Sequence, residues 1–134
     1  MINSKIIKIA SSTNNAGLKN RFTHKSSVKN SLCGDIIKTE FIADKTKIRS
    51  MRYETKSCVL CEASASLLAK KIKNKSFKDI CSLKKFYEIK RSKRIIFPVK
   101  FKEFNKLLDK NNLGRINCVI LPIEALFKAF KIKR

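Results

Sequence analysis

The sequence predicts a compact α+β fold with a small antiparallel sheet of three strands and several helices. Residues 47–53 alternate between apolar and polar side chains, which is the two-residue period of β-strands. Beyond residue 59, apolar residues instead recur every three or four positions, as on one face of a helix. Hydrophobic residues make up 43% of the chain, with only three glycines and two prolines, which argues against a disordered tail protein. We therefore expect one domain that spans residues 1–134.

The N-terminal part of the chain predicts two short elements. Residues 2–9 fit an amphipathic helix, which the polar stretch 14–17 ends. A strand predicted over residues 20–28 contains His24, the only histidine in the sequence. A lone histidine in a strand is more often packed or at the surface than a ligand, so we leave His24 out of the candidate site.

The middle of the sequence predicts a β-hairpin. Strands over residues 36–43 and 47–55 are separated by a turn at residues 44–46, so they run antiparallel. Cys33 comes just before the first of these strands, and Cys58 comes just after the second. The hairpin therefore places these two cysteines at the same end of the sheet.

Helices are predicted to fill most of the remaining chain. The first covers residues 59–73, and a second begins after Ser76, whose hydroxyl suits an N-cap, and contains Cys81 as a buried or neutral thiol. Pro98 is predicted to open a third helix and Pro122 the last one, because proline is favoured at the first helical position.

Three cysteines occupy positions that suit a metal ligand or a nucleophile. Cys58 lies where a strand gives way to a helix, and Cys118 lies just ahead of the last predicted helix. The unpaired N–H groups and the positive end of a helix favour thiolate over thiol. Cys33 is joined to Asp35 through Gly34, whose backbone freedom allows both side chains to turn inward. For Cys58 taken alone, an equally good interpretation is that any small apolar residue would serve there.

The resulting donor set contains three sulfur atoms and one carboxylate oxygen. It suits either a tetrahedral Zn2+ or the outer ligands of an iron–sulfur cluster. Thiolate is a better donor than carboxylate for these metals, so the bond between Asp35 and the metal is the easiest one to exchange. A zinc finger fits poorly, because Cys58 and Cys61 form a single CxxC pair and the sequence contains no second pair. We expect Cys61 to be a packed thiol rather than a spare sulfur carrier.

The chain carries a formal net charge of +22, from 32 Lys and Arg against 10 Asp and Glu. Such a surface attracts nucleic acid or anionic membranes. The lysines are nevertheless spread along the chain and form no aromatic platform on which bases could stack. Lys, Asn and Ile share A/T-rich codons, so genome composition explains the excess better than a specific nucleic-acid partner. A basic nucleic-acid-binding protein remains the remote alternative.

The sequence also carries information about compartment and assembly. No segment approaches the ~20 apolar residues that cross a bilayer, and the first residues lack the apolar core of a signal peptide. We expect a cytoplasmic protein that is a monomer or weak dimer. In that compartment the five cysteines act as thiols or metal ligands rather than as disulfides.

Three motifs carry a resemblance to a known family. They are Cys33-Gly34-Asp35, then Ser57-Cys58 followed by Ala63-Ser64-Ala65-Ser66, and finally Arg115-Ile116-Asn117-Cys118 with Leu121-Pro122. Together they anchor most of the chain from residue 22 to 130 and resemble the iron–sulfur cluster assembly scaffolds of the NifU N-terminal type, which include IscU and SufU. The resemblance implies a small sheet covered by helices, with the three cysteines gathered at one exposed tip. It also implies that Cys33, Asp35, Cys58 and Cys118 bind a nascent [2Fe–2S] cluster or a zinc ion.

Within this family the sequence is more similar to SufU than to IscU. Cys58 and Cys118 lie 60 positions apart (118 minus 58), as in SufU-like proteins. Asn117 stands where IscU-type proteins carry a histidine. Cys61 is a departure, because SufU-like proteins tend to have serine there.

The resemblance implies a scaffold or carrier rather than an enzyme. Such a protein accepts sulfur from a cysteine desulfurase, assembles a [2Fe–2S] cluster and passes it to apo-proteins. The alternative is a zinc-dependent sulfurtransferase that resembles SufU, in which Cys33 or Cys118 leaves the metal to accept persulfide sulfur. Arg115, beside the site, either steadies the thiolates or the partner, or is one more surface cation.

Overall fold

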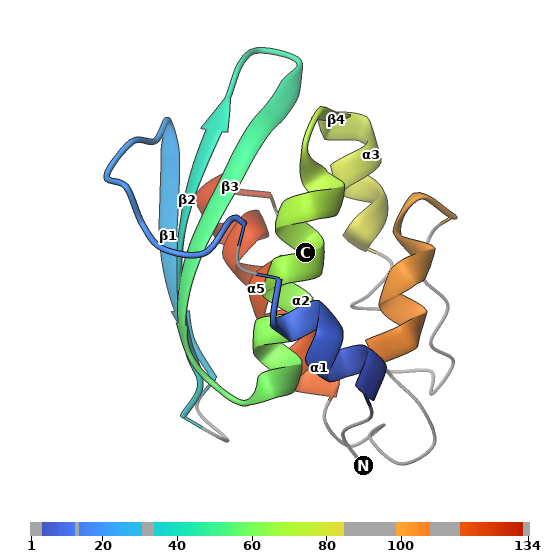
Figure 1. The fold of residues 1–134 in the computed structure, drawn as a ribbon. Coiled ribbons are helices and arrows are strands. Elements are labelled where there is room, and N and C mark those ends of the chain that lie inside the picture. Colours follow the sequence, from blue (N-terminus) through green and yellow to red (C-terminus); the bar gives the residue numbers. More distant parts are fainter. Residues whose placement is uncertain (1–3, 13, 31–33, 85–98, 108–115, 133–134) are drawn as a thin grey trace.

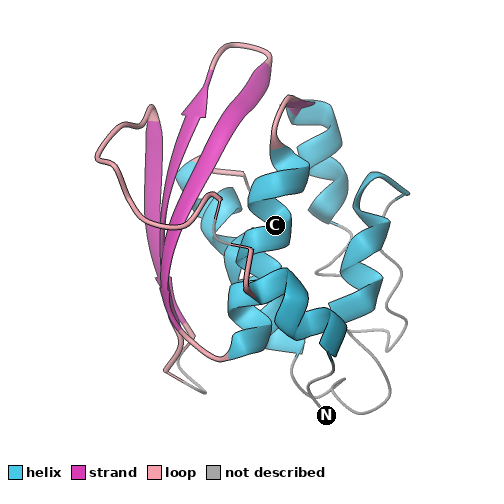
Figure 2. Ribbon diagram, in the orientation of Figure 1, coloured by secondary structure: helices cyan, strands magenta, loops and turns pink. Residues whose placement is uncertain are grey.

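A computed structural model of the chain describes residues 4–12, 14–30, 34–84, 99–107 and 116–132. The strands form one layer and the helices pack against one side of it (Figure 1, Figure 2). The sheet is antiparallel, with the order β1-β2-β3-β4. Its strands are β1 (His24–Lys29), β2 (Ile36–Ala43), β3 (Lys47–Lys56) and β4 (Lys75–Ser76). The α+β class predicted from the sequence is therefore confirmed.

The predicted hairpin is confirmed, and the sheet has one strand more than expected. β2 and β3 pair antiparallel over nearly their whole length, with an irregularity next to Ala43. The strand predicted over residues 20–28 begins later, at His24. The additional strand, β4, contains only two residues and pairs with the start of β3. Two residues carry no periodicity, so the sequence pattern had no means of indicating this strand.

The sheet alternates as its hydrophobic pattern predicts. Phe41, Met51 and Tyr53 point to the helical side and are at most 3% exposed. On the opposite side, Arg52 donates hydrogen bonds to the backbone carbonyls of residues 16 and 17. The neighbouring Glu40 accepts hydrogen bonds from the backbone N–H groups of residues 19 and 20. These two charged side chains hold the segment that leads from the first helix to β1.

Helix α2 (Val59–Ile72) lies at the centre of the helical layer (Figure 1). It packs against β3 and against three helical elements: α1 (Ser4–Ala10), η2 (Val99–Leu107) and α5 (Ile116–Ala129). The sequence pattern predicts one apolar face for this helix, but ten of its residues are buried and they lie around most of its circumference. Neighbouring elements surround α2 on several sides, and the small side chains of this helix allow them to approach closely. None of the helices in the described ranges is long and apolar enough to span a membrane.

The segment after α2 corrects one prediction. Ser76 caps α3 (Phe77–Cys81) as expected, and its hydroxyl accepts a hydrogen bond from the Asp79 backbone N–H at 3.3 Å. Cys81, predicted to be a buried or neutral thiol, is exposed. α3 has only five residues and continues as the 3-10 turn η1 (Ser82–Lys84), so Cys81 lies at the end of a short helix rather than in the middle of a long one.

The third predicted helix is present as the 3-10 element η2, with a kink at Phe101, where φ is −124° and ψ is 20°. Phe101 and Phe104 are fully buried in the core. Pro98, which was predicted to open this helix, lies outside the described residues.

The last helix begins earlier than the sequence predicts. α5 includes Ile116, so Cys118 lies inside the helix rather than ahead of it, and Pro122 lies in the interior rather than at the first position. Proline in a helix interior costs about 3 kcal/mol, because it lacks an N–H group and crowds the carbonyl four residues before it. Burial of the apolar residues 119–121 against the core offsets this cost.

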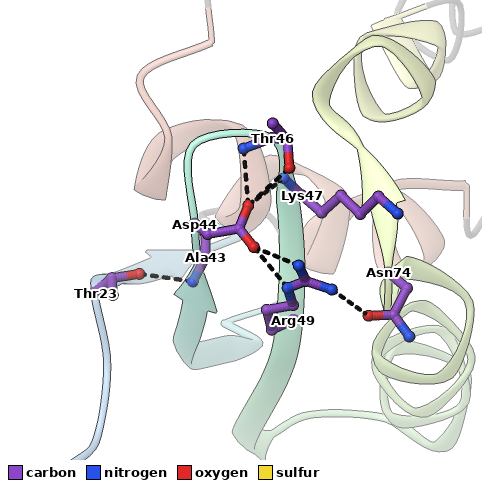
Figure 3. Close-up of polar contacts among 7 residues, drawn as sticks. All are labelled: Thr23, Ala43, Asp44, Thr46, Lys47, Arg49 and Asn74. Atoms are coloured by element: carbon purple, nitrogen blue, oxygen red, sulfur yellow. Dashed lines mark hydrogen bonds and ion pairs between the residues drawn. The ribbon is translucent and has the colours of Figure 1, made fainter.

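The β2–β3 turn is organised by one carboxylate (Figure 3). Asp44 accepts hydrogen bonds from the backbone N–H groups of Thr46 and Lys47 at 2.8 and 2.9 Å, and from the Thr46 hydroxyl at 3.0 Å. Arg49 pairs with the same carboxylate and also donates to the Asn74 side chain, which follows α2. The backbone hydrogen bond from Thr46 is the main reason that the pKa of Asp44 lies below its ordinary value of 3.8, and those from Lys47, the Thr46 hydroxyl and Arg49 add to it.

We expect Asp44→Asn to destabilise the protein at neutral pH and to reduce its sensitivity to acid. A carboxyl whose pKa is lowered by folding stabilises the native state above its unfolded pKa, near 3.8, and this stabilisation is lost as the pH falls below that value. Urea denaturation followed by circular dichroism near pH 7 and pH 3 measures both effects. Glu54→Gln, an exposed change on β3 that removes the same charge, is the control. An equal loss of acid sensitivity in both variants contradicts this prediction.

Candidate metal centre

Three side chains from distant parts of the sequence meet at one end of the sheet. Asp35 immediately precedes β2, Cys58 precedes α2, and Cys118 lies in the first turn of α5. One carboxylate oxygen of Asp35 and the sulfur atoms of Cys58 and Cys118 all lie within 4.8 Å of one another. In Figure 1 this is the lower end of the molecule, where β2 and α2 begin.

A turn that requires glycine positions Asp35. Gly34 has a φ of +78°, a left-handed conformation that other residues rarely adopt. The Gly34 N–H donates to the Asn30 carbonyl at 2.7 Å, and the Asn30 N–H donates to the Asp35 carbonyl at 2.8 Å. A Cβ atom at position 34 would meet nothing within 4 Å, so the backbone angle, and not the available space, explains the glycine.

The Asp35 side chain is only 8% exposed. Its Oδ2 atom is buried and has no hydrogen-bond partner within the described part of the chain. A buried carboxylate oxygen without a partner costs about 1–3 kcal/mol or more, and a bound ion is one partner that would remove this cost. The burial of Asp35 is the structural observation that best fits a metal or cluster ligand at this position.

Cys58 is the N-cap residue of α2, as the strand-to-helix transition in the sequence predicts. Its backbone is extended, with φ −68° and ψ 162°, and its carbonyl accepts the hydrogen bond from the Glu62 N–H at 3.2 Å. The side chain makes no capping hydrogen bond, and the residue is half-buried. The sulfur atom therefore projects from a well-defined helix start without acting as its cap.

Burial corrects the expectation of an exposed tip. Cys118 and Asp35 are each 8% exposed, and only Cys58 has intermediate exposure. Two of the three described donors are therefore enclosed where the starts of α2 and α5 meet the end of the sheet. The resemblance to a family indicated that these residues gather, but the pattern of residues could not indicate how deeply they are buried.

The other predicted site residues have different positions. Cys33 and Arg115 lie outside the described residues, so the structure places only three of the four predicted ligands. Cys61 is fully buried in the hydrophobic core, which confirms the prediction of a packed thiol. His24 pairs with Phe41 at one end of β1, whereas the site lies near the other end, where Lys29 pairs with Ile36. The His24 ring stacks on Phe130, with ring centroids 4.2 Å apart.

The sequence analysis did not identify Ser64 as a residue that supports the candidate centre. Ser64 of α2 is fully buried, and its hydroxyl donates a hydrogen bond of 2.6 Å to the carbonyl of Val119, the residue after Cys118. The available signal was a serine within a run of small residues on an apolar helix. A buried hydroxyl needs a partner, but the sequence does not show which element supplies it.

The chemistry of the three donors fits a thiophilic metal. Around a tetrahedral zinc ion, sulfur and oxygen ligand atoms lie about 3.5–3.8 Å apart. The observed group, whose donor atoms all lie within 4.8 Å of one another, therefore needs to contract by at most about 1.3 Å. Two thiols and a carboxylate leave a fourth position for a further ligand. The same donors also match the outer ligands of an iron–sulfur cluster, in which thiolates predominate.

Comparisons with known proteins agree on one family and fold. Residues 1–94 match the family model described as NifU-like N terminal domain. A nitrogen-fixing NifU-like protein (N-terminal) from Brucella abortus is 17% identical, with a TM-score of 0.84 over 96% of this chain and 91% of that chain. A putative iron–sulfur cluster assembly scaffold protein for the SUF system from Fervidobacterium islandicum AW-1 is 22% identical, with a TM-score of 0.81 over 96% and 95%. No curated protein matches the chain.

The proximity of Cys58 and Cys118 can be measured without iron. Phenylarsine oxide binds pairs of neighbouring thiols, so we expect one molecule to bind per chain in a Cys33→Ser background, detected by mass spectrometry. Adding Cys118→Ser is expected to reduce binding at least tenfold, whereas adding Cys81→Ser, at an exposed thiol, leaves it unchanged. Retention of the arsenical after loss of Cys118 would show that Cys58 binds it together with Cys61 instead, and would contradict the expected pairing of Cys58 with Cys118.

Proposed function

The chain belongs to the family of NifU-like N-terminal domains, which are iron–sulfur cluster assembly scaffolds, and from this premise we propose that it assembles a [2Fe–2S] cluster on Cys33, Asp35, Cys58 and Cys118. The family model extends over the first three of these residues but not over Cys118. The observation that carries the proposal is therefore the approach of Cys118 to Asp35 and Cys58, within 4.8 Å. It supplies a third donor from a part of the chain that the match does not reach.

In this proposal the cluster is cargo, and the protein supplies its binding site. The cysteine thiolates bind iron strongly, and a cysteine desulfurase delivers the sulfur as a persulfide. An external electron donor supplies two electrons for each persulfide, which releases the outer sulfur as cluster sulfide and restores the carrier cysteine as a thiolate. Apo-proteins then receive the finished cluster. The Asp35 carboxylate is the weaker donor toward iron, so it is the ligand at which exchange begins.

The second candidate function is zinc-dependent sulfur transfer of the SufU type. The three described donors lie close enough to surround a single ion, which favours this alternative. Cys33 or Cys118 would then attack the outer sulfur of the donor persulfide, so that a new S–S bond forms and the donor cysteine leaves as a thiolate. Cys118 is 8% exposed, so its attack requires the site to open. Arg115 is proposed to support either activity.

Several properties of the whole protein follow from the same proposal. We assign residues 95–134 to the same domain as the matched region, because α5 packs against α2, β1 and β2. The protein is proposed to be cytoplasmic, to act as a monomer or weak dimer, and to bind no specific nucleic acid. The net charge of +22 then follows from the base composition of the genome rather than from binding to a specific partner.

Metal analysis after purification without oxygen separates the two functions. A scaffold is expected to yield iron and acid-labile sulfide in equal amounts after incubation with ferrous iron, cysteine, a desulfurase and a thiol reductant, whereas a zinc-dependent transferase retains zinc and stays colourless. In the scaffold case, Cys58→Ser and Cys118→Ser are each expected to lower bound iron at least fivefold. Cys81→Ser is the matched control, because its thiol is exposed and outside the centre. Unchanged iron and sulfide in the Cys118 variant would refute the proposed ligand set.

Asp35→Ala tests the role of the oxygen ligand. We expect the variant to release its cluster or metal several-fold more slowly to an apo-protein or chelator, because the exchangeable ligand has been removed. The measurement is the decay of cluster absorption after mixing with an apo-ferredoxin or a chelator. Glu62→Ala, which removes a carboxylate from the first turn of α2, is the control. Faster release from the Asp35 variant would contradict the argument.

A further inference from the structure

The hydrogen bond between Ser64 and Val119 joins α2 and α5, the two helices at whose starts Cys58 and Cys118 lie. The Ser64 hydroxyl lies 2.6 Å from the Val119 carbonyl oxygen, and both residues are fully buried. Ser64 follows Cys58 by six positions on α2, and Val119 is the residue next to Cys118 on α5. No solvent competes for this hydrogen bond, which increases its value.

Pro122 increases the need for such an attachment. Residue 122 stands four positions after Cys118 and, being proline, has no N–H group to donate to the Cys118 carbonyl. Its ring also crowds that carbonyl. The backbone around Cys118 therefore receives less support from its own helix than a regular helical turn provides.

We infer that Ser64 is a positioning residue, which fixes the first turn of α5 on α2 so that the Cys118 sulfur reaches Cys58 and Asp35. The inference rests on the proposed function, because it assumes that these three groups bind one metal ion or cluster. Ser64 itself is not a ligand in this account. It acts through the Val119 carbonyl and the adjacent backbone of Cys118.

A second serine on the same helix provides a matched control. Ser66 is 7% exposed, and its hydroxyl donates to the Ser12 carbonyl at 3.0 Å. Ser12 follows α1, so this bond attaches a different element to α2. Ser64→Ala and Ser66→Ala each remove one hydroxyl that donates to a backbone carbonyl, but only the first touches α5.

The experiment is titration of the metal-free full-length protein with Co2+, a probe whose thiolate-to-metal charge-transfer band reports how many sulfur ligands it has. Loss of a residue that orients metal ligands typically lowers metal affinity 10–100-fold. We expect Ser64→Ala to bind Co2+ at least tenfold more weakly and with a weaker band per bound ion. Ser66→Ala is expected to keep the wild-type affinity and band. Urea denaturation of both metal-free variants measures any general loss of stability.

The outcomes are distinguishable. Equal affinities and bands in Ser64→Ala and wild type overturn the positioning role and leave the proposed function intact, as does an equal loss in both serine variants. Failure of the wild-type protein to bind Co2+ through its thiols overturns the proposed function and, with it, this inference. If Ser64→Ala does not fold, Ser64→Thr supplies the test, because it keeps the hydroxyl. A folded Ser64→Thr protein is expected to retain the cobalt band, and its loss overturns the inference.

Discussion

Close packing of α2 against α5 is the constraint on which the candidate centre depends. Cys58 and Cys118 lie near the starts of these helices, so the separation of their sulfur atoms depends on how closely the helices approach. Ser64 of α2, which contacts the Val119 carbonyl of α5, is fully buried, and its small side chain allows that approach. A side chain as large as leucine at this position would push the helices apart. The candidate donors would then separate although none of them had been changed.

The polar groups at the β2–β3 turn are well hydrogen-bonded, whereas the candidate centre contains features that lower the stability of the protein. At the β2–β3 turn every donor around Asp44 is matched by its carboxylate, which stabilises the hairpin. At the centre, the Asp35 Oδ2 atom is buried without a partner in the described chain, and Pro122 interrupts the hydrogen bonding of α5. Each of these features costs on the order of 1–3 kcal/mol. Proteins retain such features mainly where function needs them, and here both lie close to the converging donors.

The sequence predicted features that depend on local rules, and it failed where tertiary packing decides. The hairpin, the Ser76 cap and the turn at Gly34 each follow from a few neighbouring residues, and the structure has all three. The predicted start of α5 was wrong, because burial of the first apolar residues of this helix outweighs the preference of Pro122 for a helix start. The exposure of Cys81 and the partner of Ser64 depend on elements distant in sequence. No local pattern carries that information.

The attachment of the three described donors suggests where exchange of a bound ion or cluster takes place. Cys118 lies within a helix that packs on α2, and Cys58 is the N-cap residue of α2, so the backbone of each of these cysteines belongs to a helix. Asp35 is instead attached to a turn, which depends on one glycine and two backbone hydrogen bonds. Its oxygen is also the weakest donor of the set toward iron or zinc. The weak donor and its attachment to a turn therefore both support the proposal that release of a bound ion or cluster begins at Asp35.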